Sequence, residues 1–223
     1  ECGGVLELPA AIDPEEGDIS DRIQVEGSID VHQPGEYVLV LRVSDSSGNL
    51  SAPFTLTVTV VHTLAPVVTL VGEAEITIEC ATEYVDPGAT AEDQCDGTLA
   101  VAVGGDVVDP ATPGEYVITY GATDSGGFSA LPVQRRVTVV DTTPPVITLL
   151  GDSEITLQCG AAFVDPGATA TDLCAGAVPV SVEGTVDATK PGEYVLTYRA
   201  VDASDNAAVP LTRTVGVEDS ANP

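Results

Sequence analysis

The sequence predicts an all-β chain of three tandem modules, and three observations support this. The pentapeptide PGEYV begins at Pro34, Pro113 and Pro191, positions that are 79 and 78 residues apart. Other matches keep the same period, since PVVTLVG from Pro66 recurs as PVITLLG from Pro145. Segments such as EYVLTYRAVD are β-rich, and no segment holds a helical period over three turns. A period this long indicates copies of a complete small domain.

We place the modules at residues 1–63, 64–141 and 142–223, the last including a C-terminal linker. In the third copy, five to seven short strand-like segments are separated by Gly, Pro, Asp or Asn, which fits a two-sheet immunoglobulin-like β-sandwich. Residue 1 falls where the second strand of a module ends. The first module is therefore expected to lack its N-terminal strand, the counterpart of PVITLLG.

The composition excludes several functions. With 35 acidic and 7 basic residues the formal net charge is −28, which repels nucleic acid and anionic membranes. No apolar run approaches the roughly 18 residues of a membrane span, so we expect no membrane insertion. Because 43% of the residues are hydrophobic, the chain should nevertheless fold.

Two positions in each repeat are predicted to have structural roles. A tyrosine follows each Pro-Gly turn and should bond back to the backbone at a sheet corner, as in a tyrosine corner; these are Tyr37, Tyr116 and Tyr194. Eight residues later an aspartate lies in a Ser/Gly/Asn-rich hairpin turn, where capping backbone amides is the main prediction and a metal role the alternative; these are Asp45, Asp124 and Asp202.

The order of these motifs carries a family resemblance. From Pro66 to Val217, and in the first module from about Ala11, the chain resembles the bacterial surface-protein immunoglobulin-like domain, a type also found on some pesticidal crystal proteins, and more loosely the hyalin repeat. The resemblance implies a spacer or adhesive module of secreted or surface-anchored proteins, with no catalytic residues to transfer.

The cysteines repeat with a fixed spacing. Cys80 and Cys95 are 15 residues apart, as are Cys159 and Cys174, and each pair lies within one module. We predict two intramodule disulfides, each worth about 3 kcal/mol on the chain-entropy model, with zinc as the alternative. Disulfides in turn indicate an oxidising compartment, at the cell surface or outside the cell.

Cys2 is expected to lack a partner within the chain, because Glu15 stands where its module's second cysteine would be. It is then a free thiol, a link to another chain, or the partner of something upstream.

No motif predicts catalysis. His32 and His62 do not recur in the other copies and are expected at the surface, and there is no phosphate-binding loop or metalloprotease motif, so the chain is not expected to be an enzyme. Calcium is the one cofactor considered, because carboxylates crowd two loops, although solvated acidic turns are the alternative. The candidate ligands are Asp13, Glu15, Asp18, Asp93 and Asp96.

The sequence thus predicts a structural array, a stalk or fibre segment outside a bacterial cell, whose partners are neighbouring modules or copies of the same protein. The missing first strand is then either upstream in a longer array or donated by a neighbouring copy. The alternative function is an adhesin or a carbohydrate-binding accessory region that recognises a host or matrix glycan or protein. A content of 4% aromatic residues without Trp disfavours sugar stacking.

Overall fold

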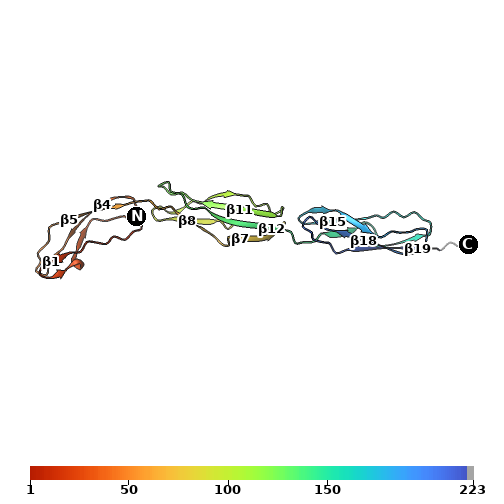
Figure 1. Ribbon diagram of the computed structural model, residues 1–223, viewed down its shortest axis with the longest axis horizontal. Coiled ribbons are helices and arrows are strands. Elements are labelled where there is room, and N and C mark those ends of the chain that lie inside the picture. The colour runs from red at the N-terminus through yellow and green to blue at the C-terminus, as the bar shows by residue number, and fades with distance from the viewer. Residues whose placement is uncertain (220–223) are drawn as a thin grey trace. The chain divides into compact units, whose positions relative to one another are not determined.

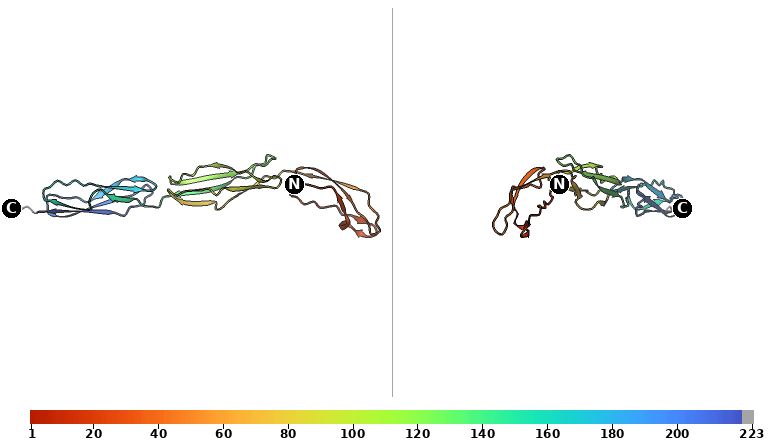
Figure 2. Two further views of the ribbon diagram at one scale, coloured as in Figure 1. Left: turned by 180° about the vertical axis from the view of Figure 1, so that it is seen from behind. Right: turned by 60° about the vertical axis from the view of Figure 1, so that its left-hand side comes forward.

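The computed structural model describes residues 1–219, which form nineteen strands and one short 3-10 helix, η1 (Ser20–Arg22) (Figure 1). The other views in Figure 2 likewise show strands and connecting loops. The predicted C-terminal linker extends into residues 220–223, which lie outside the described residues. The chain divides into two compact units, residues 1–74, 86–106 and 117–135 and residues 75–85, 107–116 and 136–223. The predicted all-β class is confirmed.

The third module contains two sheets. One has the order β13-β15-β16 and the other β14-β19-β18-β17, with β14 parallel to β19 and the remaining neighbours antiparallel. The strands are β13 (Val146–Leu149), β14 (Glu154–Gln158), β15 (Ala168–Asp172), β16 (Gly176–Val178), β17 (Val180–Glu183), β18 (Gly192–Ala200) and β19 (Leu211–Glu218).

The core of this module draws on both sheets. Ile147 of β13 and Ala170 of β15 pack with Leu196 and Tyr198 of β18, and all four are buried. Along β18 and β19 the buried positions alternate with more exposed ones, as expected for strands with one face toward a core. Two facing sheets around one apolar layer make the predicted immunoglobulin-like β-sandwich.

The second module repeats this arrangement, with sheets β6-β8-β9 and β10-β11-β12-β7. Here β7 pairs parallel to β12, as β14 does with β19. The strands are β6 (Val67–Leu70), β7 (Glu75–Glu79), β8 (Ala89–Asp93), β9 (Gly97–Leu99), β10 (Ala102–Gly105), β11 (Gly114–Gly121) and β12 (Val133–Val140).

The first module has fewer strands. Residues 1–63 form the pair β1-β2 and the sheet β3-β4-β5, and they contain no counterpart of β6 or β7. Residues 1–63 thus lack the strand whose absence the sequence predicts, and a second strand as well. Its strands are β1 (Ile12–Asp13), β2 (Gly17–Asp18), β3 (Gln24–Glu26), β4 (Gly35–Arg42) and β5 (Phe54–Val60).

The repeated tyrosines bond the backbone in the same way in each module. The hydroxyl of each donates to the carbonyl oxygen four residues earlier, at 2.8, 2.9 and 3.0 Å for Tyr37, Tyr116 and Tyr194. These bonds tie the Pro-Gly turn to the start of β4, β11 and β18, so the repeated pentapeptide stabilises a strand entry.

Modules two and three each contain one fully buried arginine that bonds residues of its own module. In the third module Nη1 of the fully buried Arg213 pairs with Asp165 and donates to the Tyr198 hydroxyl at 2.8 Å. Its other two nitrogens, Nη2 and Nε, donate to the carbonyls of Leu150 and Asp152 at 2.5 and 2.9 Å. Burial, and then the hydrogen bond to Asp165, raise the pKa of Tyr198 to about 12. The guanidinium thus supplies hydrogen-bond donors to backbone carbonyls of the turn between β13 and β14.

Arg135 makes the same set of contacts in the second module. It pairs with Asp86 and donates to the Tyr120 hydroxyl and to the carbonyls of Val71 and Glu73. In the first module Leu41 and Leu56 stand at the positions of the tyrosine and the arginine. The module that has no β6-β7 turn in these residues also lacks the side chains that bond it.

Candidate functional site

Both disulfides lie at junctions between predicted modules. The structure links Cys2 to Cys95, with Cα atoms 5.2 Å apart, and Cys80 to Cys174, with Cα atoms 5.6 Å apart. The predicted pairs Cys80–Cys95 and Cys159–Cys174 are wrong, and so is the prediction that Cys2 has no partner in the chain. Each bridge instead joins one predicted module to the next.

The position of the cysteines in the strands explains the error. Cys174 lies in the turn between β15 and β16, at the entry side of its module, whereas the Cys159 amide donates to the Glu218 carbonyl at the end of β19. Their 15-residue spacing includes all of β15, which rises about 16 Å. A disulfide tolerates a Cα separation of only about 7 Å. The two cysteines therefore lie at opposite ends of the module and do not meet.

The remaining cysteine, Cys159, is the free one among the described residues. It occupies the position of Cys2 and Cys80 in the repeat, and all three amides donate to the last residues of the module's final strand or the linker after it. Its Sγ lies 3.1 Å from the Thr189 carbonyl oxygen.

The first junction also buries a histidine. His62, in the linker after β5, presents Nε2 at 3.2 Å from Asp124 Oδ2 and 3.4 Å from Asp93 Oδ1. The side chains of His62, Asp93 and Asp124 are 7%, 2% and 0% exposed. The expectation of a surface position was wrong for His62, because the turn after β8 and the hairpin after β11 enclose the linker. His32 is exposed, and its Nδ1 lies 2.9 Å from the Gln94 carbonyl oxygen.

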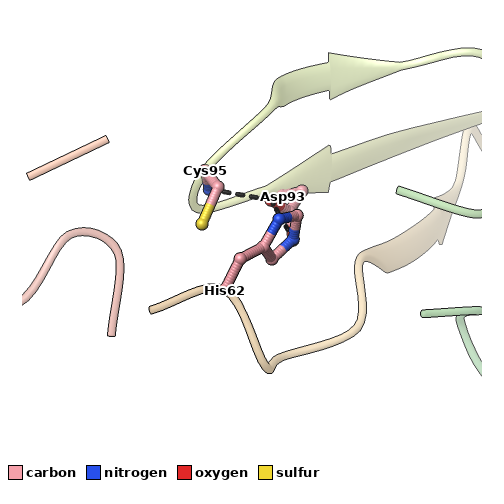
Figure 3. Close-up of side chains that lie close together, drawn as sticks. All are labelled: His62, Asp93 and Cys95. Atoms are coloured by element: carbon pink, nitrogen blue, oxygen red, sulfur yellow. Dashed lines mark hydrogen bonds and ion pairs between the residues drawn. The ribbon is translucent and has the colours of Figure 1, made fainter. Parts of the chain in front are cut away.

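Figure 3 shows the imidazole of His62 reaching toward Asp93, with Cys95 in the same β8–β9 turn. Asp93 Oδ1 accepts the amides of Cys95 and Asp96 at 2.7 and 2.9 Å, which fixes the carboxylate. By contrast, His62 Nε2 and Asp124 Oδ2 have no hydrogen-bond partner although both atoms are buried. The ring of Phe128 lies 5.9 Å from the imidazole.

The second junction places three carboxylates at the corresponding positions. Oxygens of Asp141, Asp172 and Asp202 lie within 4.8 Å of one another. Asn206 donates to Asp202 Oδ2 and to the Asp141 carbonyl, both at 3.0 Å, and the Ser204 hydroxyl donates to Asp141 Oδ2 at 3.1 Å. Asp172 Oδ1 accepts the amides of Cys174 and Ala175 at 2.7 and 2.8 Å, so each of the three carboxylates has hydrogen-bond donors.

Other contacts also differ between the junctions. At the first, Asp96 accepts the amide and hydroxyl of Ser125 at 2.6 and 2.8 Å, and these bonds, the backbone one foremost, lower the pKa of Asp96. At the second, the amide of Thr142 first, and then the Thr142 and Thr143 hydroxyls, lower the pKa of Glu79. Polar bonds therefore accompany each disulfide.

The carboxylates of Asp13 and Asp18, in the acidic loop of the first module, bond groups close to them in the sequence and do not gather around one point. Asp13 Oδ1 accepts the amides of Glu15 and Glu16, and Asp18 Oδ1 accepts the amide and hydroxyl of Ser20. Of the five proposed calcium ligands, Asp93 alone belongs to either of the His/Cys/Asp/Glu groups found close enough together to hold an ion among residues 1–219. Calcium binding stays a prediction.

The hairpin aspartates cap their own turns. Asp45, Asp124 and Asp202 each accept the amide four residues later, at 2.7 to 2.8 Å. In two of the modules that residue is an asparagine, Asn49 or Asn206, whose side chain bonds the second carboxylate oxygen. In the second module it is Phe128, which leaves Asp124 Oδ2 to face His62.

An apolar recess of about 280 Å³ opens in the first module. Its lining includes Ala11, Leu41 and Phe54, the repeat counterparts of Ala170, Tyr198 and Leu211. In the third module those residues belong to, or pack against, the core cluster that contains Ile147 of β13. The recess therefore corresponds to the place that a β13-like strand fills.

Sequence reasoning missed the role of His62 because it weighed each histidine alone. A signal was present: His62 stands at the repeat position of Asp141, and Phe128 at that of Asn206, so two differences fall on one junction. In the described part of the chain, no helix is long and apolar enough to span a membrane.

Comparison with known proteins agrees with the repeat. The model of the family described as "Bacterial surface protein, Ig-like domain" matches residues 8–60, 68–139 and 147–217. Each match lies inside one predicted module.

Two hyalins are similar, each 30% identical. That of Strongylocentrotus purpuratus aligns with 81% of this chain and 16% of its own length, and that of Lytechinus variegatus with 87% and 39%. The chain therefore spans less than half of either relative.

Among solved structures, a Bacteroides thetaiotaomicron lipoprotein is 33% identical over 35% of this chain and 40% of its own, with a TM-score of 0.32. Drosophila N-cadherin domains are 18% identical over 94% of this chain and 63% of theirs, with a TM-score of 0.34. The three family matches together cover most of the sequence, and the chain belongs to the bacterial surface protein Ig-like domain family.

Proposed function

We propose that the chain is a segment of an extracellular stalk or fibre whose function is to span distance and resist extension. The observation that carries this proposal is that both disulfides cross a module boundary. Each junction then has two covalent connections, the peptide linker and the bridge. A linker alone allows bending, whereas a second connection to the neighbouring turn restricts it.

The loops closed by the bridges are long and they overlap. Residues 2–95 and 80–174 share the segment between Cys80 and Cys95. On the chain-entropy model a loop of this size stabilises the folded state by about 4 to 5 kcal/mol. Tension applied to the ends of the oxidised chain cannot extend most of either loop, because the force passes through the sulfur atoms.

Charge and compartment support the same proposal. The net charge of −28 keeps copies apart unless salt screens it. Two disulfides fit an oxidising compartment, and the family is one of surface proteins. We propose a position outside the cell.

The experiment compares the oxidised chain with a Cys95→Ser/Cys174→Ser variant carrying dyes near both ends. Single-molecule energy transfer should give a narrow distance distribution for the oxidised chain and a broader one for the variant. Glycan arrays and matrix-protein pull-downs should show no specific retention. Equal distributions would contradict the spacer proposal, and saturable binding of a glycan would favour the adhesin alternative.

Strand donation is a finer proposal for the first module. We propose that a strand with the PVITLLG pattern fills the recess beside Leu41 and Phe54 and pairs with β1, as β13 pairs with β15. The chemistry is the same whether the strand precedes this segment or comes from a second copy.

A peptide with the sequence of residues 145–151 tests the recess directly. It should raise the melting temperature of the chain, and a scrambled peptide should not. Concentration-dependent oligomers that disappear when the same strand is fused to the N-terminus would indicate donation between copies. Monomers that bind the peptide would instead favour a strand from upstream. A monomer whose melting temperature does not change with the peptide would contradict the proposal.

A further inference from the structure

We propose that His62, Asp93 and Asp124 form a zinc-binding site at the first module junction. The inference does not depend on the proposed spacer function. It starts from two buried polar atoms, His62 Nε2 and Asp124 Oδ2, that have no hydrogen-bond partner. Buried polar atoms are nearly always satisfied, so such a pair indicates that a group belongs between them.

The two distances from the imidazole fit a shared cation. Nε2 lies 3.2 Å from Asp124 Oδ2 and 3.4 Å from Asp93 Oδ1, yet it forms a hydrogen bond with neither. Ligands held about 2.0 to 2.1 Å from a tetrahedral zinc ion lie about 3.3 Å from one another and off each other's lone-pair axis. Two carboxylate oxygens at this range from Nε2 suit ligands that share one ion with the imidazole.

The donor set selects the kind of metal. Imidazole with carboxylates suits zinc and other first-row transition ions, whereas calcium prefers an all-oxygen site. A dication also offsets two carboxylates that are 2% and 0% exposed, which is otherwise costly for neighbouring anions. Three protein ligands leave one coordination position for a water molecule.

The surroundings hold the ligands in place. Two amides of the β8–β9 turn fix Asp93, the Phe128 amide fixes Asp124 Oδ1 at 2.8 Å, and the Phe128 ring lies beside the imidazole. Cys95 Sγ lies within 4.8 Å of the ligand atoms of His62 and Asp93, but it is bonded to Cys2. The oxidised site is therefore a histidine–carboxylate site.

A protonated His62 in a double ion pair is the competing explanation. It would also place a positive charge between Asp93 and Asp124, and it requires no metal. The two explanations differ in one observable, which is whether Zn²⁺ adds stability that depends on His62.

The test uses the full oxidised chain with Cys159→Ser, which removes the free thiol as a metal ligand. Calorimetric titration with Zn²⁺ should show one equivalent bound, reversed by EDTA, and the melting temperature should rise with zinc concentration. His62→Gln and Asp124→Asn should each weaken binding by more than about 100-fold, beyond the roughly 10- to 100-fold loss that is usual for a supporting residue. His32→Gln is the matched control and should bind like the parent.

Cobalt provides a second readout that unfolding does not mimic. Co²⁺ should give a visible absorption spectrum with the parent and with His32→Gln, and Zn²⁺ should abolish it. The proposal is overturned if the parent binds no zinc, or if His62→Gln binds it as well as the parent does. The first outcome would assign the site to a protonated histidine, and the second would place the metal elsewhere.

Discussion

The two module junctions share their covalent design and differ in their polar chemistry. Both carry a disulfide between the end of one module and the β-hairpin turn of the next. The first surrounds His62 with two carboxylates, whereas the second brings together three carboxylates with asparagine and serine donors. The comparison shows that both junctions keep the disulfide, whereas the polar side chains beside it differ.

The largest loss of stability is expected when the buried arginine of either module is removed, and comparing the two losses tests whether the modules are equivalent outside their junctions. Arg135→Ala and Arg213→Ala should each destabilise their own module by about 3 kcal/mol, because each leaves a partly buried aspartate and turn carbonyls without their partner. Denaturant unfolding of both variants measures this. Unequal losses would show that the modules differ in more than their junctions.

Removing a bridge tests the covalent part of the comparison. Cys95→Ser and Cys174→Ser should each lower stability by about 2 to 4 kcal/mol, which is below the chain-entropy value because the reduced unfolded chain retains structure. The two losses should be similar because the loops have similar length. Cys159→Ser is the control and should change little. Digestion without reduction should yield peptides linked 2–95 and 80–174, with alkylation at Cys159 alone. Peptides linked 80–95 would refute the pairing.

Exchanging two side chains tests the polar part. Phe128→Asn should give Asp124 Oδ2 the donor that Asn206 gives Asp202, and should weaken zinc binding at the first junction. Asp141→His with Asn206→Phe should create a second zinc equivalent. A stability change of about 1 kcal/mol is expected for the gained hydrogen bond. If neither exchange changes zinc binding, the side chains at these positions do not determine which junction binds zinc.

Acid should affect the first junction through a bond that the second lacks. Asp96 accepts from Ser125, and Ala175 stands at its repeat position. Because folding lowers the pKa of Asp96, this contact stabilises above the usual aspartate range near pH 4 and is lost as the pH falls through the lowered value. Asp96→Asn should reduce the acid dependence. Calcium titration of the same proteins tests the separate calcium prediction.

The fold was largely predictable because it depends on local patterns that repeat. PGEYV and the alternating strands fixed the all-β modules, and the first module's missing strand followed from alignment of the copies. The disulfide partners were not predictable from a 15-residue spacing, because the two cysteines that are near in sequence lie at opposite ends of the same module. Similarly, the burial of His62 depends on turns some 30 and 60 residues later in the chain.

The most direct measurement of the central claim is the extension of single oxidised chains pulled from both ends. With bridges 2–95 and 80–174, only residues 80–95 and those beyond 174 can extend, so the unfolded length should reach roughly 230 Å, and roughly 750 Å after reduction. Bridges within modules would allow roughly 650 Å before reduction. An oxidised length near roughly 230 Å would support disulfides that cross the module junctions. A length near roughly 650 Å before reduction would contradict them.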